Sequence, residues 1–418
     1  MKSSRSVFVV APLLPWPPHD GGRIGIAFRI RELARHGVRV RLFATQLPTE
    51  PRQRGALEEW CEEVITVQRP ARGSQLFRQP FQPYGFTTRY LPELRACLRD
   101  RITRHPPDVV HLEQTQMGEY WRDVPPEIPV LLGVHNLEFR GLLAQARSLG
   151  IRPKAIAYWV EGVRLRAAER RLFSRARLDG LVFVSCEERA WVERAFPKLA
   201  GRCLHLPPGC DLWEHAGDLA SRPMNLAFVG GLWFQPNVQG LLWFLRNVWP
   251  AVLRSVPAAT LTVAGRGASA DLENSLRETV GVRYVGQVEE VRHAYDGARG
   301  VVLPIRHGAG VKVKTVEAVG TGVPCVGTMH AFGGLNLENH RCCLMADEPA
   351  EFAALCIDVL MDPDMGRELG NRARAFAEAN LTWTAIGRRY VTVIDALVGG
   401  VPIGADPSLR QPPRLTPL

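Results

Sequence analysis

The sequence predicts an α/β fold of two doubly wound, Rossmann-like parallel sheets that face each other across a cleft. Apolar, β-branched runs alternate with amphipathic helical stretches along most of the 418 residues, as expected for parallel strands with crossover helices. The alternation breaks once, at PPGCDLWEHAGDLASRP (207–223), and then restarts. The length fits two or three domains. We therefore expect an N-terminal domain over 1–215, a second over 216–385, a terminal helix over 386–398 that packs back on the first domain, and a disordered Pro-rich tail over 399–418.

In the first half, strands and helices are expected in alternation. The strands are SVFVVAP (6–12), VRVRLFAT (38–45), PDVVHLE (107–113), PVLLGVH (129–135) and LDGLVFVS (178–185). The helices are 24–37, 91–105, 154–175 and 186–196. Ser185 followed by Glu188 predicts a capping box at the start of the last helix.

The second half repeats the pattern. Its expected strands are 224–229, 259–264, 282–286, 300–305 and 323–328, and its expected helices are 237–257, 291–298, 313–321 and 351–361. In open parallel sheets, ligands bind outside the carboxyl ends of the strands, so the turns after the strands are the candidate sites.

Composition narrows the class of protein. Apolar content of 46% and charged content of 22% are those of a soluble globular protein, and no apolar run approaches the length of a membrane span. The start of the chain reads as a buried strand rather than a signal peptide. Nine cysteines form no CxxC pair, so we expect reduced core residues of a cytoplasmic protein and no metal site.

A net charge of +10 admits acidic partners. The basic residues concentrate at 69–105, where arginines interleave with aromatic residues. The main interpretation is a solvated arginine-rich surface. The alternative is an acceptor-binding or membrane-facing surface, which would place the protein peripherally at the inner face of the plasma membrane. Nucleic acid is not expected, because no helix-turn-helix, zinc-finger or RNA-binding signature is present.

Glycine-bearing turns follow several strands. PHDGGR places Gly21 and Gly22 between the first strand and its helix, where backbone N–H groups can approach an anion. This is not the GxGxxG of a dinucleotide site, and no such motif follows any strand, which argues against a nicotinamide or flavin enzyme. In the second half, Gly231, Arg266 and Gly286 lie in three turns that open on one edge of the sheet. Together they predict a backbone-lined nucleotide pocket.

The stretch HGAGVKVKTVEAVGTGVP (307–324) carries two of the five lysines of the chain. Lys314 and Glu317 share a helix face, and Lys312 lies nearer the helix N-terminus. Cations there oppose the helix dipole, so stability alone would not select them. A diphosphate held by the turn and the two lysines would explain why cations stand there. Glu317 would then accept hydrogen bonds from a ribose diol. The alternative is a Lys–Glu surface pair.

His135 ends an apolar strand. It is either a satisfied interior histidine, which is the commoner case, or a substrate contact at the carboxyl edge of the sheet.

These segments together resemble the retaining GT-B glycosyltransferases of family four, the nucleotide-sugar-dependent group 1 enzymes. The match runs to about residue 398 through PHDGGR, HNLE, LVFVSCEER with PPGCD, FVGGLWFQPNVQGLLWFL and GAGVKVKTVEAVGTGVPCVGT. The resemblance implies a retaining transferase that needs no metal or other cofactor. Its donor would be a UDP-sugar or GDP-sugar, and its acceptor a glycan, a lipid-linked molecule or another small molecule. Polysaccharide or glycoconjugate biosynthesis in a bacterium is the implied setting.

The resemblance also implies residue roles. Gly22 would lie by the diphosphate and the transferred sugar, and His135 would touch that sugar. Lys314, with Lys312 and Arg306, would neutralise the departing diphosphate, which is electrostatic stabilisation of a leaving group. Glu317 would bind the ribose.

The sequence departs from the family pattern at several positions. Ala309 stands where the first of two family glutamates is common, so the backbone of Ala309 and Gly310 would contact the sugar instead. Leu232 and Gln235 replace the usual basic pair, and Pro208 replaces an asparagine. The DPD at 362–364 resembles a metal-binding DxD, but its place before a helix predicts an N-cap.

Two other functions stay open. One is a non-transferring enzyme of the same fold, such as a nucleotide-sugar epimerase. The other is a catalytically inactive sugar-nucleotide-binding partner. This alternative is retained because Ala309 replaces the first of the two family glutamates.

Overall fold

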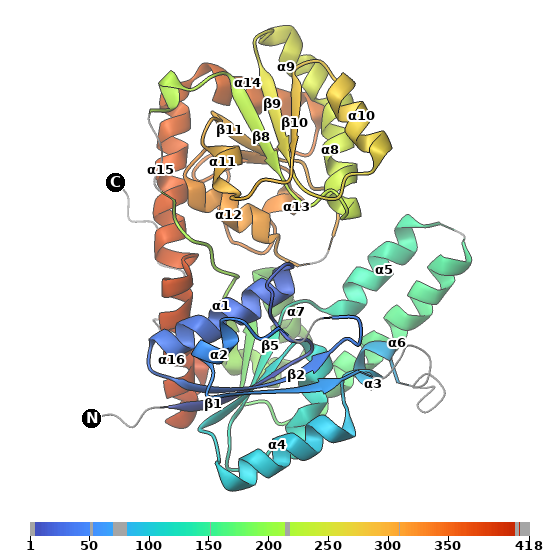
Figure 1. Ribbon diagram of the computed structural model, residues 1–418, viewed down its shortest axis with the longest axis vertical. Helices are drawn as coiled ribbons and strands as arrows, with labels where there is room; N and C mark the ends of the chain where they lie inside the picture. Colours follow the sequence, from blue (N-terminus) through green and yellow to red (C-terminus); the bar gives the residue numbers. More distant parts are fainter. Residues whose placement is uncertain are drawn as a thin grey trace. The chain divides into compact units, whose positions relative to one another are not determined.

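The computed structural model describes residues 5–50, 53–69, 82–150, 152–213, 218–308, 310–405 and 409. These residues form two compact units, each built on one parallel sheet (Figure 1). The first unit runs to Pro207 and resumes at Trp383, and the second spans Pro208–Thr382. The division thus falls earlier than the expected 215/216, because Cys210 already pairs with Thr382 in a parallel bridge inside the second unit. The expected tail over 399–418 lies largely outside the described residues.

The sheet of the first unit has seven parallel strands in the order β3-β2-β1-β4-β5-β6-β7. Their bounds are β1 (Ser6–Ala11), β2 (Arg39–Gln46), β3 (Glu63–Gln68), β4 (Val109–Glu113), β5 (Val130–Val134), β6 (Gly180–Phe183) and β7 (Cys203–His205). The edge strands β3 and β7 were not expected from the sequence. Both are less uniformly apolar than the central strands, since one sheet edge has no neighbour to cover it.

Helices cover both faces of this sheet. Along β1, Val7 and Val9 pack with α1 (Gly21–Arg35) and α16 (Trp383–Val398), whereas Phe8 and Val10 pack with the opposite layer. That layer contains α4 (Pro92–Arg104), α6 (Pro153–Arg175) and α7 (Cys186–Ala195). The remaining helices of this unit are α2 (Leu57–Trp60), α3 (Tyr84–Thr87), η1 (Thr115–Asp123), α5 (Glu138–Ser148), η2 (Pro197–Arg202) and η4 (Ile403–Ala405).

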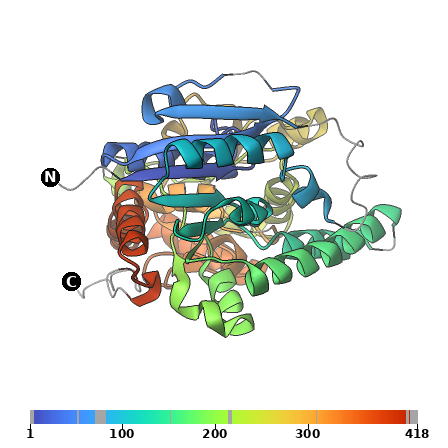
Figure 2. The ribbon, with the colours of Figure 1, turned by 90° about the horizontal axis from the view of Figure 1, so that it is seen from below.

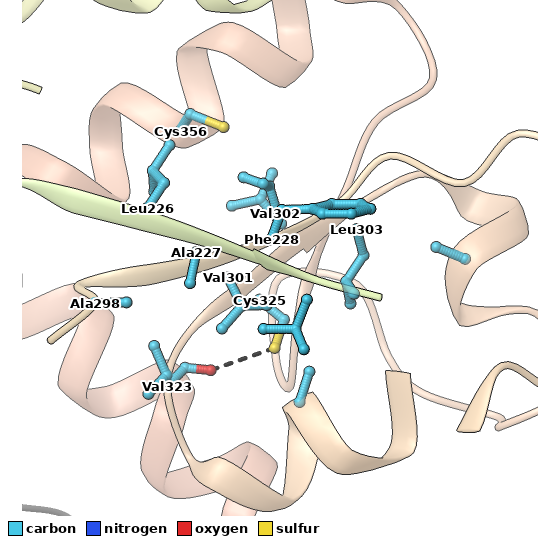
Figure 3. Close-up of a cluster of buried hydrophobic side chains, with 14 of the residues drawn as sticks. Leu226, Ala227, Phe228, Ala298, Val301, Val302, Leu303, Val323, Cys325 and Cys356 are labelled. Atoms are coloured by element: carbon cyan, nitrogen blue, oxygen red, sulfur yellow. Dashed lines mark hydrogen bonds between the residues drawn. The ribbon is translucent and has the colours of Figure 1, made fainter. Parts of the chain in front are cut away.

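The sheet of the second unit has the order β10-β9-β8-β11-β12-β13. Its strands are β8 (Asn225–Val229), β9 (Thr260–Ala264), β10 (Val282–Gly286), β11 (Gly300–Leu303), β12 (Cys325–Gly327) and β13 (Leu344–Met345). Figure 3 shows the core beside β8 and β11, where Phe228, Val302 and Leu303 pack together and the Cys325 thiol donates to the carbonyl of Val323 at 3.3 Å. The cysteines are free, and seven of the nine are buried, as the sequence predicts.

The second unit carries its helices on both sides of the sheet (Figure 1). They are η3 (Leu219–Ser221), α8 (Gln235–Asn247), α9 (Trp249–Ser255), α10 (Ala270–Glu278), α11 (Arg292–Tyr295), α12 (Val313–Thr321), α13 (Met329–Phe332), α14 (Pro349–Met361) and α15 (Pro363–Asn380). In the part of the chain that the structure describes, no helix combines the length and apolarity needed to cross a bilayer.

Two local predictions need correction. The helix expected over 237–257 is two helices, α8 and α9, that meet at Val248. Pro250 explains the break, because a proline removes a backbone donor and is accepted in the first turn of a new helix. The capping box is only half formed. The Ser185 hydroxyl accepts from Glu188 N, but the Glu188 carboxylate accepts from Leu137 N at 3.0 Å.

The DPD prediction is confirmed, since Asp362 caps α15 by accepting from Met365 N at 2.9 Å. We expect Asp362→Ala to lower the free energy of unfolding by about 1 kcal/mol, because a helix-initiating N–H loses its partner. Chemical denaturation measures this. Asp364→Ala is the matched control, because Asp364 is exposed and its carboxylate pairs with Arg367. Equal losses in the two variants would contradict the capping role.

Candidate active site

Lys314 is the centre of the candidate site in the second unit. It lies in the first turn of α12, which follows the N-cap residue Lys312 and ends at the left-handed Gly322. The Lys314 amine donates to Asn237 Oδ1 at 2.6 Å and lies 5.1 Å from the centre of the Phe228 ring. Burial, and then the charge of Lys312, lowers the pKa of Lys314 to about 7. The environment therefore disfavours the cation unless an anion joins it.

Asn237 connects this lysine to the glycine turn after β8. Its side-chain amide donates to the carbonyl of Gly231 at 2.9 Å. A Cβ atom at Gly230 would lie 3.0 Å from Asn237 Nδ2 and 3.4 Å from Lys314 Nζ. The turn and the lysine are therefore in contact, and glycine at 230 leaves room for the pair.

The three glycine turns expected on one edge of the sheet do lie together. Gly230 N donates to Ala264 O at 3.0 Å, and Gly265 N donates to Gly286 O at 2.8 Å. A Cβ atom at Gly265 would lie only 2.0 Å from Gly230 O, so glycine is required there. Gly286 has φ 70°. These close backbone approaches confirm the prediction that the turns share one edge of the sheet.

Glu317 lies one helical turn after Lys314. Burial, and then the charge of Asp211, raises its pKa to about 7. Among the described residues no ion pair joins Lys314 to Glu317, and the Lys314 amine donates to Asn237 instead, so the two residues do not form the surface pair that the sequence left as an alternative. Both side chains are partly buried, and burial disfavours the charged form of each.

The other expected residues of this unit vary in their surroundings. Arg266 is exposed in the turn after β9, and its carbonyl accepts from Leu232 N at 2.8 Å. Arg306 is exposed and its guanidinium lies 4.8 Å from the centre of the Trp243 ring. Gly310 has φ 68°, which favours glycine, and precedes α12. Ala309 lies outside the described residues.

In the first unit, Gly21 and Gly22 form the start of α1. Asp20 caps this helix by accepting from Arg23 N at 3.0 Å. A Cβ atom at Gly22 would lie 3.6 Å from Gln114 Nε2. Gln114 has φ 71°, a strained conformation for a residue other than glycine, directly after β4. Strain of this kind clusters at functional sites.

His135 belongs to a buried charge cluster. Its Nε2 lies 2.8 Å from Glu113 Oε2, and it is 8% exposed. Glu113 also accepts from Arg29 of α1, and its other near neighbour is His111 Nδ1 at 3.6 Å. A Cβ atom at Gly133 would lie 2.7 Å from Glu113 Oε2, so the strand must carry glycine there. The geometry is that of a satisfied interior histidine with one nitrogen bound to a carboxylate.

Arg29 keeps the Glu113 carboxylate of this cluster ionised. Burial alone would raise the pKa of Glu113, but Arg29 and the two histidines hold it well below its usual range. Burial lowers the pKa of His111 to about 4, so His111 is neutral at pH 7. Arg29 also lies over the ring of Tyr390, 4.6 Å from its centre.

Three side chains of these two sites were not predicted from the sequence. Asn237 stands in the first turn of a helix after a glycine turn, and Glu113 is the only acid of an otherwise uncharged buried strand. Arg29 lies one turn after Ile26, on the buried face of its helix. A charged residue placed on an apolar face is the signal that would have indicated the cluster.

The arginine-rich segment 69–105 is described only in part, since 70–81 lie outside the described residues. Arg95 and Arg99 both pair with Asp123, and Arg101 pairs with Glu63 at 2.8 Å. Protein carboxylates thus neutralise much of the described positive charge. Among the described residues, no three His, Cys, Asp or Glu side chains are grouped so as to hold a metal ion.

The two units, each built on one parallel sheet, have the GT-B fold. Sucrose-phosphate synthase of Thermosynechococcus elongatus superposes with a TM-score of 0.66 at 19% identity, covering 94% of this chain and 100% of that one. HepE of Anabaena, whose structure holds UDP-glucose, gives a TM-score of 0.61 at 15% identity, covering 93% and 99%. S. aureus TarM, in a complex that contains UDP, gives 0.61 at 8% identity, covering 94% and 100%.

Sequence comparison gives the family. Residues 21–214 match Glycosyltransferase Family 4, and residues 223–362 match Glycosyl transferases group 1. A Klebsiella pneumoniae protein described as an uncharacterized 44.6 kDa protein in the cps region is 25% identical over 397 residues, covering 90% of this chain and 96% of that protein. The chain belongs to the family 4, group 1 glycosyltransferases.

Proposed function

We propose that this glycosyltransferase moves a sugar from a nucleoside diphosphate sugar to an acceptor with retention of the anomeric configuration, and that Lys314 binds the departing diphosphate. The observation that carries the proposal is the position of its amine. It is partly buried beside Gly230 and Asn237, and burial lowers its pKa to about 7, so an anion would stabilise its charged form. A diphosphate is the anion that such a site would accept at the N-terminus of a helix.

We propose the remaining roles from the family resemblance. Lys312 and Arg306 supply further positive charge, and the backbone at Gly231, Gly286, Ala309 and Gly310, with Arg266, surrounds the nucleotide. Glu317 accepts hydrogen bonds from the ribose hydroxyls. In the first unit, Gly21 and Gly22 contact the donor. His135, whose Nε2 is occupied by Glu113, would approach the transferred sugar with the remaining part of its ring.

In the proposed step, the acceptor oxygen bonds to the anomeric carbon as the bond from that carbon to the phosphate oxygen breaks. The acceptor proton passes to the phosphate oxygen on the same face. Lys314 neutralises the charge that develops on the diphosphate, so the protein supplies mainly electrostatic stabilisation. No protein nucleophile or metal ion takes part in this scheme.

A UDP-sugar is the first donor to test, because HepE and TarM bind UDP or UDP-glucose. The cps-region relative supports a role in making a bacterial polysaccharide or glycoconjugate. A glycan or lipid-linked acceptor fits that role.

A thermal-shift panel tests the donor site. UDP, GDP, ADP, dTDP and their sugar conjugates are added with and without EDTA. A ligand at about 100 times its Kd adds about 2.7 kcal/mol to the free energy of unfolding, which raises the melting temperature. We expect one base to give a clear shift that survives EDTA. No shift with any nucleotide contradicts the proposal. Binding without transfer to any acceptor would favour the inactive partner, and donor conversion without acceptor would favour the epimerase.

The pKa of Lys314 makes donor binding dependent on pH. A diphosphate stabilises the protonated amine, so at about pH 8, where the unbound amine with its pKa of about 7 is mostly neutral, binding takes up close to one proton. Affinity should fall by up to about tenfold per pH unit above that pKa. Glu317 is already ionised at that pH, so it contributes little.

Calorimetry of nucleotide binding in phosphate and in Tris buffer measures this uptake as a difference in observed enthalpy. The uptake should disappear in Lys314→Met. Equal enthalpies in the two buffers for the wild-type chain would show that another group binds the anion.

A further inference from the structure

Helix α6 (Pro153–Arg175) carries an apolar stripe that no described residue covers. Ile156, Trp159, Val160 and Val163 are exposed by 61, 57, 42 and 42%. Their spacing of i, i+3, i+4 and i+7 places them on one face of the helix. The opposite face is the packed one, since Leu165 and Leu172 belong to the core of the first unit. Four large apolar side chains gathered on one exposed face differ from scattered surface residues and indicate an interaction surface.

The exposed charges of the same helix have one sign. Every exposed charged residue of α6 is basic; they are Lys154, Arg166, Arg170, Arg171 and Arg175. The two acids of the helix are turned inward. Glu161 accepts from Tyr84 N at 2.6 Å, and Glu169 accepts from the Thr115 hydroxyl at 2.7 Å. In steps of 3.6 residues per turn, Arg166, Arg170 and Arg171 continue the face that carries the apolar stripe.

Helices α5 and α6 form a pair that presents an extended surface. In Figure 2, the pair formed by α5 (Glu138–Ser148) and α6 extends away from the strands of the first unit. Gly162 allows the two helices to pack closely, because a Cβ atom there would lie 2.9 Å from Leu143 Cδ2. The exposed stripe therefore lies on a firmly packed helix pair.

We propose that this face of α6, defined by Ile156, Trp159, Val160, Val163, Arg166, Arg170 and Arg171, docks the protein on an anionic lipid surface. A helix that pairs an apolar stripe containing tryptophan with arginines lies in the interface of a bilayer, its apolar side chains in the headgroup boundary and its cations among anionic headgroups. Charge decides against a second copy of the chain, because symmetric pairing of this face would bring arginines against arginines. Nucleic acid would not need the aliphatic stripe. The inference does not depend on transferase activity.

Vesicle flotation with the full chain tests the proposal. Vesicles of phosphatidylcholine alone are compared with vesicles that also contain phosphatidylglycerol. We expect binding to the anionic vesicles, weakened by salt, and little binding to the neutral ones. Each arginine near an anionic surface contributes about fivefold, so Arg166→Gln, Arg170→Gln and Arg171→Gln together should lower the partition coefficient on the order of 100-fold.

The matched control carries the same change of charge at Arg246, Arg254 and Arg283, which are exposed in the second unit. Gln substitutions at Ile156, Trp159, Val160 and Val163 test the apolar stripe, with Val280→Gln, Met361→Gln and Val401→Gln as their control at other exposed apolar positions. An unchanged melting temperature shows that each variant folds. The arginine variant keeps the test valid if the stripe variant does not fold.

Absence of binding to anionic vesicles, or equal binding by α6 variants and controls, would overturn the proposal. A dimer in sedimentation equilibrium that the stripe variant disperses would assign the face to a second copy instead. Nucleotide-induced thermal shifts of the α6 variants should equal those of the wild type, so failure here is distinct from failure of the donor site.

Discussion

Lys314→Met is expected to lower turnover about 100-fold or more while leaving the free energy of unfolding unchanged or slightly higher. The loss follows because one preorganised group that stabilises charge on a leaving group contributes about 100- to 1000-fold to the rate. Stability should not fall, since burial has already lowered the pKa of this amine to about 7 and methionine removes the cost of desolvating it. Turnover is measured with the donor that the thermal-shift panel identifies, and stability by chemical denaturation without ligand.

Lys198→Met is the control for this variant, because Lys198 is an exposed lysine of the first unit whose amine, within the described part of the chain, donates to the carbonyl of Ser174. It should leave turnover and nucleotide binding unchanged. Normal turnover in Lys314→Met would remove this lysine from the mechanism. A large loss of stability would instead make it a structural residue, held by Asn237 and Phe228 alone.

Glu113→Gln is expected to cost about 3–5 kcal/mol of unfolding free energy, because it leaves Arg29 buried without its anion. The carboxylate also holds His135 at 2.8 Å, so the amide should change the orientation of that ring. Urea denaturation of wild type and variant at neutral pH measures the loss. Glu338→Gln is the control, since its pair with Arg341 is exposed and should contribute less than about 1 kcal/mol.

The difference in unfolding free energy between wild type and Glu113→Gln should depend on pH if the ion pair with Arg29 causes it. The folded pKa of Glu113 lies well below the ordinary 4.5, so the stabilisation is present above that value and is lost as the pH falls through the folded pKa. The gap between wild type and Glu113→Gln should therefore narrow between about pH 5 and about pH 3. A gap that stays constant over this range would assign the loss to packing rather than to the ion pair.

Local sequence patterns were sufficient for most of the fold. Runs such as Ser6–Ala11 and Asn225–Val229 are apolar after their first residue, so their burial in parallel sheets follows from composition and periodicity alone. The edge strand β7 was missed because three residues carry too little pattern. The break at Val248 could be expected from Pro250, but the apolar periodicity on both sides concealed it.

The sequence by itself determined the class of the protein, because the glycine turns, the Lys312–Glu317 helix and the α/β alternation are local features that need no knowledge of distant contacts. The tertiary structure alone decided which polar groups act together. Asn237 meets Lys314 at 2.6 Å, and Arg29, Glu113 and His135 form one cluster, although each set comes from separate elements. Charge and burial depend on neighbours that folding brings together from far along the chain. For that reason the altered pKa values of Lys314 and Glu113, and the uncovered face of α6, could be recognised only in the folded protein.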